Sequence, residues 1–337
     1  MISVIIPTRG TGSFDKLKRL LQSLALQTII PTQVLIIIDF DVPKKPLQDM
    51  ITEWCNNYSL GDTLGIEICC QDGYGVSSAR NWGVKKSFND YLLVCDDDIE
   101  LQDKRTLELF LDHYQFTNRE ASIEKGLIFY PTIMVHNTDH IQTQGFIGYN
   151  RLLCRPVSLY ASEWKSKLRK YILSLGAGIG FQSSHKVVTY LQLIGNICFF
   201  ATKKTLIDNP WDEKFTFIYE DLDQSFGAYK QGVQLVSLPD IQINHRETPK
   251  DLLAQGYINN PDNVYLKTRH RIWFVLKHAN RYQKILFYCC GFRISNLRTL
   301  IMILIGNLTN HIGRKKRNKL IQSRRRGIKD GLEGLKI

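Results

Sequence analysis

The segment Tyr91-Leu92-Leu93-Val94-Cys95-Asp96-Asp97-Asp98 joins five mostly apolar residues to three consecutive acids. The apolar run predicts a strand that is buried on both faces. Three adjacent carboxylates repel one another, so the end of a buried strand is unfavourable for them unless a cation is present. In an extended chain Asp96 and Asp98 point to the same side, and hard oxygen ligands suit Mg²⁺ or Mn²⁺. The segment therefore predicts a metal site, with a solvated acidic turn as the alternative.

On the N-terminal side of this segment, strand-like and helix-like patterns alternate. The short apolar runs are 2–6, 34–38 and 66–69, and the segments with helical periodicity are 14–24, 50–58 and 78–88. This alternation implies a mostly parallel sheet that is covered by helices on both faces. We therefore predict an α/β fold in which ligands bind at the carboxyl ends of the strands.

Polar residues follow two of the other predicted strands. Pro7-Thr8-Arg9 comes after the first strand, and Asp39 and Asp41 come after the second. Because the carboxyl ends of parallel strands share one rim of a sheet, these residues are expected to lie near the three acids.

The C-terminal half holds a second pair of acids and a histidine. A predicted helix, 220–231, starts with Glu220-Asp221 and is stopped by Gly232. The two acids are either favourable charge at the positive end of a helix or a general base that points into the cleft. His245 follows the next predicted strand, 233–238, and could complete a carboxylate site for Mn²⁺ or Mg²⁺, although a lone histidine is more often structural.

Two further segments carry glycine or cationic signals. Arg80 lies near the start of the predicted helix 78–88, where a helix N-terminus and a guanidinium could bind an anion; the alternative is a capped helix with a surface arginine. Gly176-Ala177-Gly178-Ile179-Gly180 is a candidate lid, because a cleft that closes over its substrate needs a movable segment.

Taken together, these motifs resemble family 2 glycosyltransferases of the GT-A fold, over about residues 2–245. Ser3–Thr8 is similar to the family's opening strand, Gln27-Thr28 to its Gln-Thr pair, and Gly75–Gly83 to its G-x-S-x-A-R-N-x-G helix. Asp96–Asp98 is similar to its D-x-D motif, Trp211–Asp223 to its DE-x-F…ED signature, and His245 to its C-terminal histidine. The family commonly has paired acids after the second strand, whereas this chain has Asp39-Phe40-Asp41 there. Which of these two acids meets the base of the nucleotide therefore stays open.

The resemblance also implies roles for the site residues. Asp221 would be the catalytic base, positioned by Glu220, and Asn196 would lie near the donor sugar. The residues expected to bind the nucleotide are Pro7, Thr8, Arg9, Asp39, Asp41, Arg80, Asp96 and Asp97. The expected metal ligands are Asp96, Asp98 and His245.

The expected reaction is a metal-dependent transfer of a sugar from a nucleotide donor to an acceptor hydroxyl. The metal would neutralise the diphosphate leaving group, Asp221 would accept the hydroxyl proton, and the resemblance implies inversion at the anomeric carbon. One alternative is a nucleotidyltransferase, for which Arg9-Gly10-Thr11-Gly12 is a weak phosphate loop. The other is a non-catalytic protein that binds membranes or nucleic acid.

The net charge of +12 comes from the C-terminal segment. Residues 1–262 hold 26 Lys and Arg against 30 Asp and Glu, whereas residues 263–329 hold 17 Lys and Arg and no acid. The stretch Thr299–Gly313 has no charge but is too short and polar to span a membrane. We therefore expect a glycosyltransferase domain at 1–262 and a basic amphipathic helical segment at 263–337, which lies on an anionic membrane surface. Nucleic-acid binding and a helical core with a solvated basic face are the alternatives.

The expected cellular setting is the inner face of the cell membrane. None of the eight cysteines forms a C-x-x-C pair, and Met1 leads straight into an apolar run without the basic start of a signal peptide, so a cytoplasmic, peripheral protein is expected. Tyr265–Lys277 and Arg326–Gly334 resemble family members that build bacterial surface polysaccharides. This likeness implies a glycan or lipid-linked acceptor, a UDP-, dTDP- or GDP-linked donor and a hexosyl- or rhamnosyl-type transfer, without nucleic acid as a partner.

Overall fold

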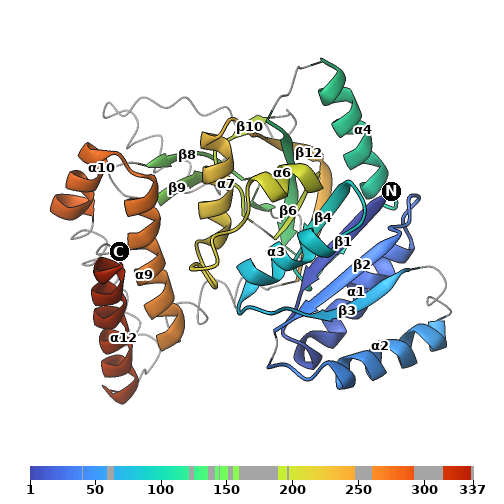
Figure 1. Cartoon of the computed structure of the whole chain (residues 1–337), viewed down its shortest axis with the longest axis horizontal. Coiled ribbons are helices and arrows are strands. Elements are labelled where there is room, and N and C mark those ends of the chain that lie inside the picture. The colour runs from blue at the N-terminus through green and yellow to red at the C-terminus, as the bar shows by residue number, and fades with distance from the viewer. Residues whose placement is uncertain are drawn as a thin grey trace.

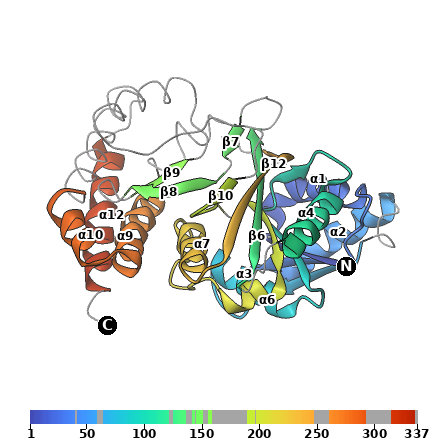
Figure 2. The same ribbon diagram turned by 90° about the horizontal axis from the view of Figure 1, so that it is seen from above.

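The computed structural model describes residues 1–39, 41–58, 64–120, 125–135, 141–143, 145–150, 155–158, 189–195, 197–246, 260–291 and 314–334. Its centre is a ten-stranded sheet in the order β10-β12-β6-β11-β4-β1-β2-β3, with β5 and β7 paired to β12 and β6. Helices flank this sheet, as Figures 1 and 2 show from two directions. The predicted α/β class is confirmed.

The N-terminal half of the sheet is parallel, as the alternating pattern predicted. Its elements are β1 (Ile2–Pro7), η1 (Thr11–Ser13), α1 (Phe14–Ala25), β2 (Gln33–Ile38), α2 (Lys44–Tyr58), β3 (Ile66–Cys70), α3 (Val76–Lys86) and β4 (Tyr91–Cys95). Strand β1 pairs in parallel with both β2 and β4, and β2 pairs in parallel with β3. The chain moves outward from β1 to β3 and then returns to β4. Because such crossovers are right-handed, α3 lies on the opposite face of the sheet from α1 and α2.

The other half of the sheet mixes directions. It contains β5 (Ile99–Leu101), α4 (Thr106–Glu120), β6 (Leu127–Val135), β7 (Ile141–Thr143), β10 (Thr189–Leu191), β11 (Cys198–Thr202), α6 (Lys203–Asp208), α7 (Glu220–Lys230) and β12 (Gln234–His245), beside a separate hairpin of β8 (Phe146–Asn150) and β9 (Arg155–Ser158). Strand β11 runs antiparallel between β4 and β6, while β12 is parallel to β6 and antiparallel to β5. The predicted strand 233–238 continues to His245, and this extension is what meets β5.

Helix α3 lies close to the sheet because it carries a glycine at the contact. A methyl group on Gly83 would come within 2.5 Å of Cγ2 of Ile5, a separation that real contacts do not reach. At the start of the same helix, Gly75 has a left-handed φ of 85° and its Cα faces Thr216. These two glycines hold α3 against β1 at one point and against the segment before α7 at the other.

The C-terminal helices form a layer beside α7. They are α9 (Pro261–His278), α10 (Arg281–Leu286), the π-helical turn η3 (Phe287–Gly291) and α12 (Arg314–Glu333), and α9 and α12 lie side by side in both views. Gly327 and Gly331 of α12 face α9, where a methyl group would meet the Tyr265 carbonyl oxygen at 2.6 Å and Ile272 at 2.9 Å. Among the residues described, no helix combines the length and the apolar character that crossing a membrane requires.

Candidate active site

The carboxyl ends of β1, β2 and β4 meet at one rim, and the polar residues predicted for it lie there. The Thr8 hydroxyl, directly after β1, donates a 2.5 Å hydrogen bond to Oδ2 of Asp97, directly after β4. Burial raises the pKa of Asp97, and hydrogen bonds from Thr8 and Ser13 act against that shift. The first strand therefore fixes the middle acid of the D-x-D segment.

Arg80 of α3 joins the two acidic motifs. Its guanidinium lies 2.9 Å from Oδ1 of Asp96 and 3.4 Å from Oε1 of Glu220, and the side chain is only 3% exposed. The guanidinium is also 5.9 Å from the centre of the Trp211 ring. The resemblance led us to expect Arg80 at the nucleotide. The structure places it between two carboxylates whose positions are 124 residues apart in the chain.

The two carboxylates beside Arg80 are perturbed in the same direction. Burial, opposed by Arg80, raises the pKa of Asp96 to about 7, although 35% of its side-chain surface remains exposed and solvent weakens the effect. Burial and repulsion by Asp221 raise the pKa of Glu220 to about 8, again with Arg80 opposing the shift. The Arg80 cation thus favours the charged forms of both groups, while burial favours their protonated forms.

Asp98 and His245 form the second charged contact of the rim. His245 Nε2 lies 3.2 Å from Oδ1 of Asp98, and Lys16 Nζ lies 3.2 Å from its Oδ2. Strand β5 brings His245 to Asp98. It follows the acids directly and pairs with the end of β12, so that His245 lies opposite Ile99. Burial acts to raise the pKa of Asp98, but His245 and Lys16 outweigh it and the pKa is lowered.

The described residues fit a divalent metal only in part. Across them, no group of three or more His, Cys, Asp and Glu side chains is arranged to hold a metal ion. Asp98 and His245 are brought together, whereas Asp96 has one carboxylate oxygen paired with Arg80. Mg²⁺ and similar ions at phosphate sites take one or two protein ligands and complete their shell with phosphate oxygens and water. Asp98 and His245 are therefore compatible with such an ion, and the full ligand set stays a prediction.

Glu220 and Asp221 open α7 immediately after a strained turn. Ile218 and Tyr219 have φ values of 63° and 77°, the left-handed region that side chains rarely adopt and that is least favourable for a β-branched residue. Such residues cost of order 1–3 kcal/mol each and persist only where the surrounding structure holds them. Oδ1 of Asp221 accepts a 2.8 Å hydrogen bond from the Leu222 backbone, which sets the carboxylate at the helix start.

Gly195 and Tyr130 lie beside Asp221. A methyl group on Gly195 would be 3.6 Å from Oδ2 of Asp221 and 3.3 Å from the Tyr130 hydroxyl oxygen. Tyr130, in β6, is fully buried. Tyr130 is not among the predicted site residues, because an aromatic residue within an apolar run indicates only a position in the core.

The segment 211–216 is held by α3. Asn81 accepts a 2.9 Å hydrogen bond from the Trp211 backbone N–H and donates a 2.8 Å bond to the Trp211 carbonyl oxygen. The Val76 backbone N–H donates to the Thr216 carbonyl oxygen at 3.1 Å. Two adjacent residues of α3 therefore contact both parts of the Trp211–Asp223 signature. Arg80 pairs with the Glu220 carboxylate, and Asn81 binds the Trp211 backbone.

The two acids after β2 have different surroundings. Oδ1 of Asp39 accepts hydrogen bonds from the Gln71 amide and from the Gly75 backbone N–H, the latter at 3.2 Å, whereas Asp41 is exposed. Arg9 is also exposed and its guanidinium lies 5.3 Å from the centre of the Phe217 ring. Asp39 is thus the acid that the structure fixes at the rim. Asn196 and the glycine segment 176–180 lie outside the described residues.

Comparison with known proteins tests the family resemblance and the fold. The family model described as "Glycosyl transferase family 2" matches residues 3–153, so the predicted resemblance is confirmed over that range. A crystal structure of GalNAc-T7 with UDP, GalNAc and Mn²⁺ is similar with a TM-score of 0.58 and 14% identity, over 85% of this chain and 49% of that one. The chain therefore spans about half the length of GalNAc-T7, and this likeness confirms the GT-A fold.

A second solved structure is similar over a longer range. The crystal structure of residues 1–349 of S. aureus TarS has a TM-score of 0.48 and 15% identity, over 99% of this chain and 91% of that one. The same fragment in complex with UDP-GlcNAc gives 0.47 and 16%, over 99% and 92%. No curated protein sequence matches the chain.

Proposed function

We propose, from the family 2 sequence of residues 3–153, that this chain transfers a sugar from a nucleotide donor to an acceptor hydroxyl, with inversion at the anomeric carbon. The observation that carries the proposal is the position of Arg80. Its guanidinium pairs with both Asp96 of the D-x-D segment and Glu220 of the second acidic motif. The nucleotidyltransferase alternative assigns no role to the second motif. A binding protein without activity has no need for two acids held by one buried arginine.

In this reaction Asp221 accepts the proton of the attacking hydroxyl, and Glu220, tied to Arg80, positions it. Asp98 and His245 would hold Mg²⁺ or Mn²⁺, which when bound neutralises charge on the diphosphate leaving group. The remaining contacts to the nucleotide and donor sugar are assigned to Pro7, Thr8, Arg9, Asp39, Asp96, Asp97 and Asn196. GalNAc-T7 was solved with UDP and Mn²⁺, so these are the first nucleotide and metal to test.

Donor turnover tests the proposal. The chain is incubated with Mn²⁺ or Mg²⁺ and UDP-, dTDP- or GDP-linked sugars, and release of nucleoside diphosphate is measured. We expect one donor class to turn over, EDTA to stop it, and Asp98→Asn to reduce it at least about 100-fold, because charge stabilisation by a metal contributes several kcal/mol.

The matched control is Asp208→Asn, which changes an exposed acid of α6 that pairs with Lys204, and it should turn over like the unaltered chain. Release of sugar 1-phosphate instead of nucleoside diphosphate would establish nucleotidyl transfer. Absence of turnover with every donor, even with membrane lipid extract as the acceptor source, would contradict the proposal.

We also propose that the chain works on the inner face of the cell membrane, with a lipid-linked glycan as acceptor and residues 263–329 on anionic lipid. One face of α10 and η3 is exposed and apolar, with Tyr282 78%, Ile285 51% and Tyr288 36% exposed. Phe287 in the same turn is buried against α9 and so fixes that face outward. Exposed tyrosine and isoleucine next to cations are typical of helices that lie in the membrane interface.

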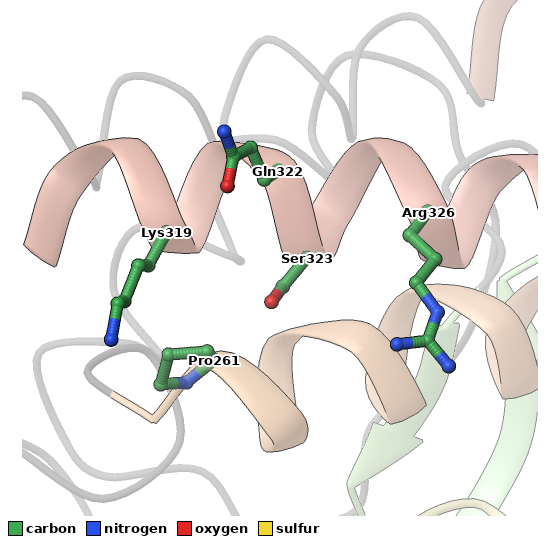
Figure 3. Close-up of a pocket in the computed structure, with 5 residues that line it drawn as sticks. All are labelled: Pro261, Lys319, Gln322, Ser323 and Arg326. Carbon is green, nitrogen blue, oxygen red and sulfur yellow. The ribbon is translucent and has the colours of Figure 1, made fainter.

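Helix α12 adds cationic groups to the same layer. Figure 3 shows Lys319, Ser323 and Arg326 pointing from α12 toward the start of α9, where they line a hollow of about 340 Å³. Residues 263–329 contain no acid, so lipid phosphates would meet no opposing negative charge from this segment. This charge pattern supports an anionic bilayer as the partner.

Vesicle binding tests this partner. We expect the chain to sediment with phosphatidylglycerol vesicles and not with phosphatidylcholine vesicles, and the triple change Tyr282→Ser, Ile285→Ser and Tyr288→Ser to weaken binding at least about tenfold, because each side chain contributes apolar area to the bilayer. Tyr190→Ser, at a tyrosine of β10 that is 64% exposed, is the matched control and should bind normally. Equal binding by the triple variant, or equal binding to neutral vesicles, would contradict the proposal.

A further inference from the structure

Helix α9 contacts the turn that opens the catalytic helix. His270 of α9 is fully buried, and its Nδ1 lies 2.8 Å from the carbonyl oxygens of both Phe217 and Ile218. Those carbonyls belong to the strained turn that directly precedes Glu220. An α9 side chain therefore meets the backbone whose conformation sets the direction of the two acids.

The partners of His270 determine its protonation. Nε2 lies 2.8 Å from the Arg269 guanidinium, which can only donate hydrogen bonds, so Nε2 accepts. The proton of the neutral ring is then on Nδ1, which donates to the two carbonyl oxygens. Burial lowers the pKa of His270 to about 4, consistent with a ring that stays neutral at physiological pH.

The left-handed conformation of Ile218 and Tyr219 needs this support. Neither residue is a glycine, so the turn is costly in isolation and is maintained by its surroundings. The Phe215 ring packs against His270 with ring centres 5.2 Å apart, and the Tyr219 ring packs on Phe274 at 5.7 Å. Within this apolar contact, His270 gives the turn a directional hydrogen bond.

Helix α9 also holds α7 one turn further on. Asp223 is buried and its two carboxylate oxygens lie 2.7 Å from Lys277 Nζ and 2.7 Å from His278 Nε2. Glu220 and Asp221 are thus flanked by two contacts with the same helix, one through backbone carbonyls and one through the buried carboxylate of Asp223.

Behind α9, a chain of hydrogen bonds continues into α12. The Tyr265 hydroxyl donates a 2.8 Å bond to Asp330 of α12 and accepts a 3.0 Å bond from Arg269. A continuous path therefore runs from Asp330 through Tyr265 and Arg269 to His270 and the catalytic turn. The glycines of α12 that allow close approach to α9 bring Asp330 into this path.

We propose that His270 is a positioning residue that fixes the Glu220–Asp221 turn for catalysis, so that the functional unit extends beyond residue 262 into α9. The proposal rests on the proposed glycosyl transfer. It assigns the basic C-terminal segment a second role besides membrane contact.

Two amide variants separate the two hydrogen bonds of the ring. His270→Asn places its amide nitrogen where Nδ1 is, so it can still donate to the Phe217 and Ile218 carbonyls but loses Arg269. His270→Gln reaches the place of Nε2, so its carbonyl oxygen can accept from Arg269 but nothing donates to the turn. We expect the glutamine variant to lower kcat about 10- to 100-fold with the donor KM changed less than about twofold, because small displacements of a catalytic group cost up to about 100-fold. The asparagine variant should keep kcat within about threefold.

Val264→Ala is the control for lost stability, because Val264 packs on Leu320 at the other end of α9. It should lower Tm without changing kcat. Hydrogen exchange of the amides in 217–222 is measured on the same proteins and should be faster in the glutamine variant alone. Normal exchange and normal kcat in the glutamine variant, or equal losses in the Val264→Ala and glutamine variants, would overturn the proposal. If the unaltered chain turns over no donor, the proposed function fails, and the exchange rates still decide the role of His270.

Discussion

Asp221→Asn is expected to reduce the transfer of sugar about 100- to 10,000-fold, the range that a positioned general base contributes. Asparagine has nearly the shape of aspartate and its oxygen can still accept the hydrogen bond from the Leu222 backbone N–H. The change therefore removes the basic group and leaves the start of α7 as it is. The measurement is kcat for nucleoside diphosphate release with the donor that the unaltered chain uses, together with Tm, which should not change.

Glu220→Gln is the informative companion to this variant. Glu220 is nearly buried and is tied to Arg80, so its neutral amide should lower stability and reduce kcat less than the change at Asp221 does. If Asp221→Asn keeps more than about a tenth of the turnover and Glu220→Gln loses nearly all of it, the base is Glu220 and the assigned roles are reversed.

The parts of the site that local pattern could predict are those that sit at strand ends. Apolar runs located β1, β2 and β4, and parallel pairing brings their carboxyl ends to one rim, so the Thr8 contact with Asp97 follows from topology. The mixed half of the sheet was not predicted in this detail. Strand direction there depends on how β11 inserts between β4 and β6. A short apolar run predicts a strand but does not indicate whether it pairs parallel or antiparallel to its neighbours.

The contacts that give the acids their chemistry could not be predicted from local pattern. Asp98 meets His245 because β5, only three residues long, pairs with the far end of a twelve-residue strand. The role of His270 was even harder to predict, because in the sequence it is one residue of a basic helix. Its proposed role depends on hydrogen bonds to two carbonyl oxygens more than fifty residues earlier in the chain. Sequence periodicity shows which face of a helix is buried but does not show which backbone groups lie opposite it.

Arg80→Met is expected to lower the free energy of unfolding by about 3 kcal/mol at pH 8, the lower end of the cost of breaking a buried ion pair, because Asp96 retains some exposure. Methionine keeps much of the apolar volume of the arginine stem but leaves Asp96 and Glu220 without the cation between them. Their pKa values, already raised by burial, rise further in the folded variant. In both proteins the native state binds more protons than the unfolded state over this range, and the excess is larger in the variant, so the stability of the variant falls more steeply as pH increases from about 5 to 8.

Urea unfolding at pH 5, 6, 7 and 8 measures this dependence, and the difference from the unaltered chain should be smallest at pH 5. Arg105→Met, at an exposed arginine that pairs with Glu108 on the surface of α4, is the matched control and should change stability by less than about 1 kcal/mol at every pH. Adding Glu220→Gln to Arg80→Met should recover part of the loss at pH 8, because the amide removes one of the two acids that must otherwise stay protonated or be charged without a partner cation. A loss that is the same at all four pH values would show that Arg80 acts through packing against Trp211 and not through the carboxylates.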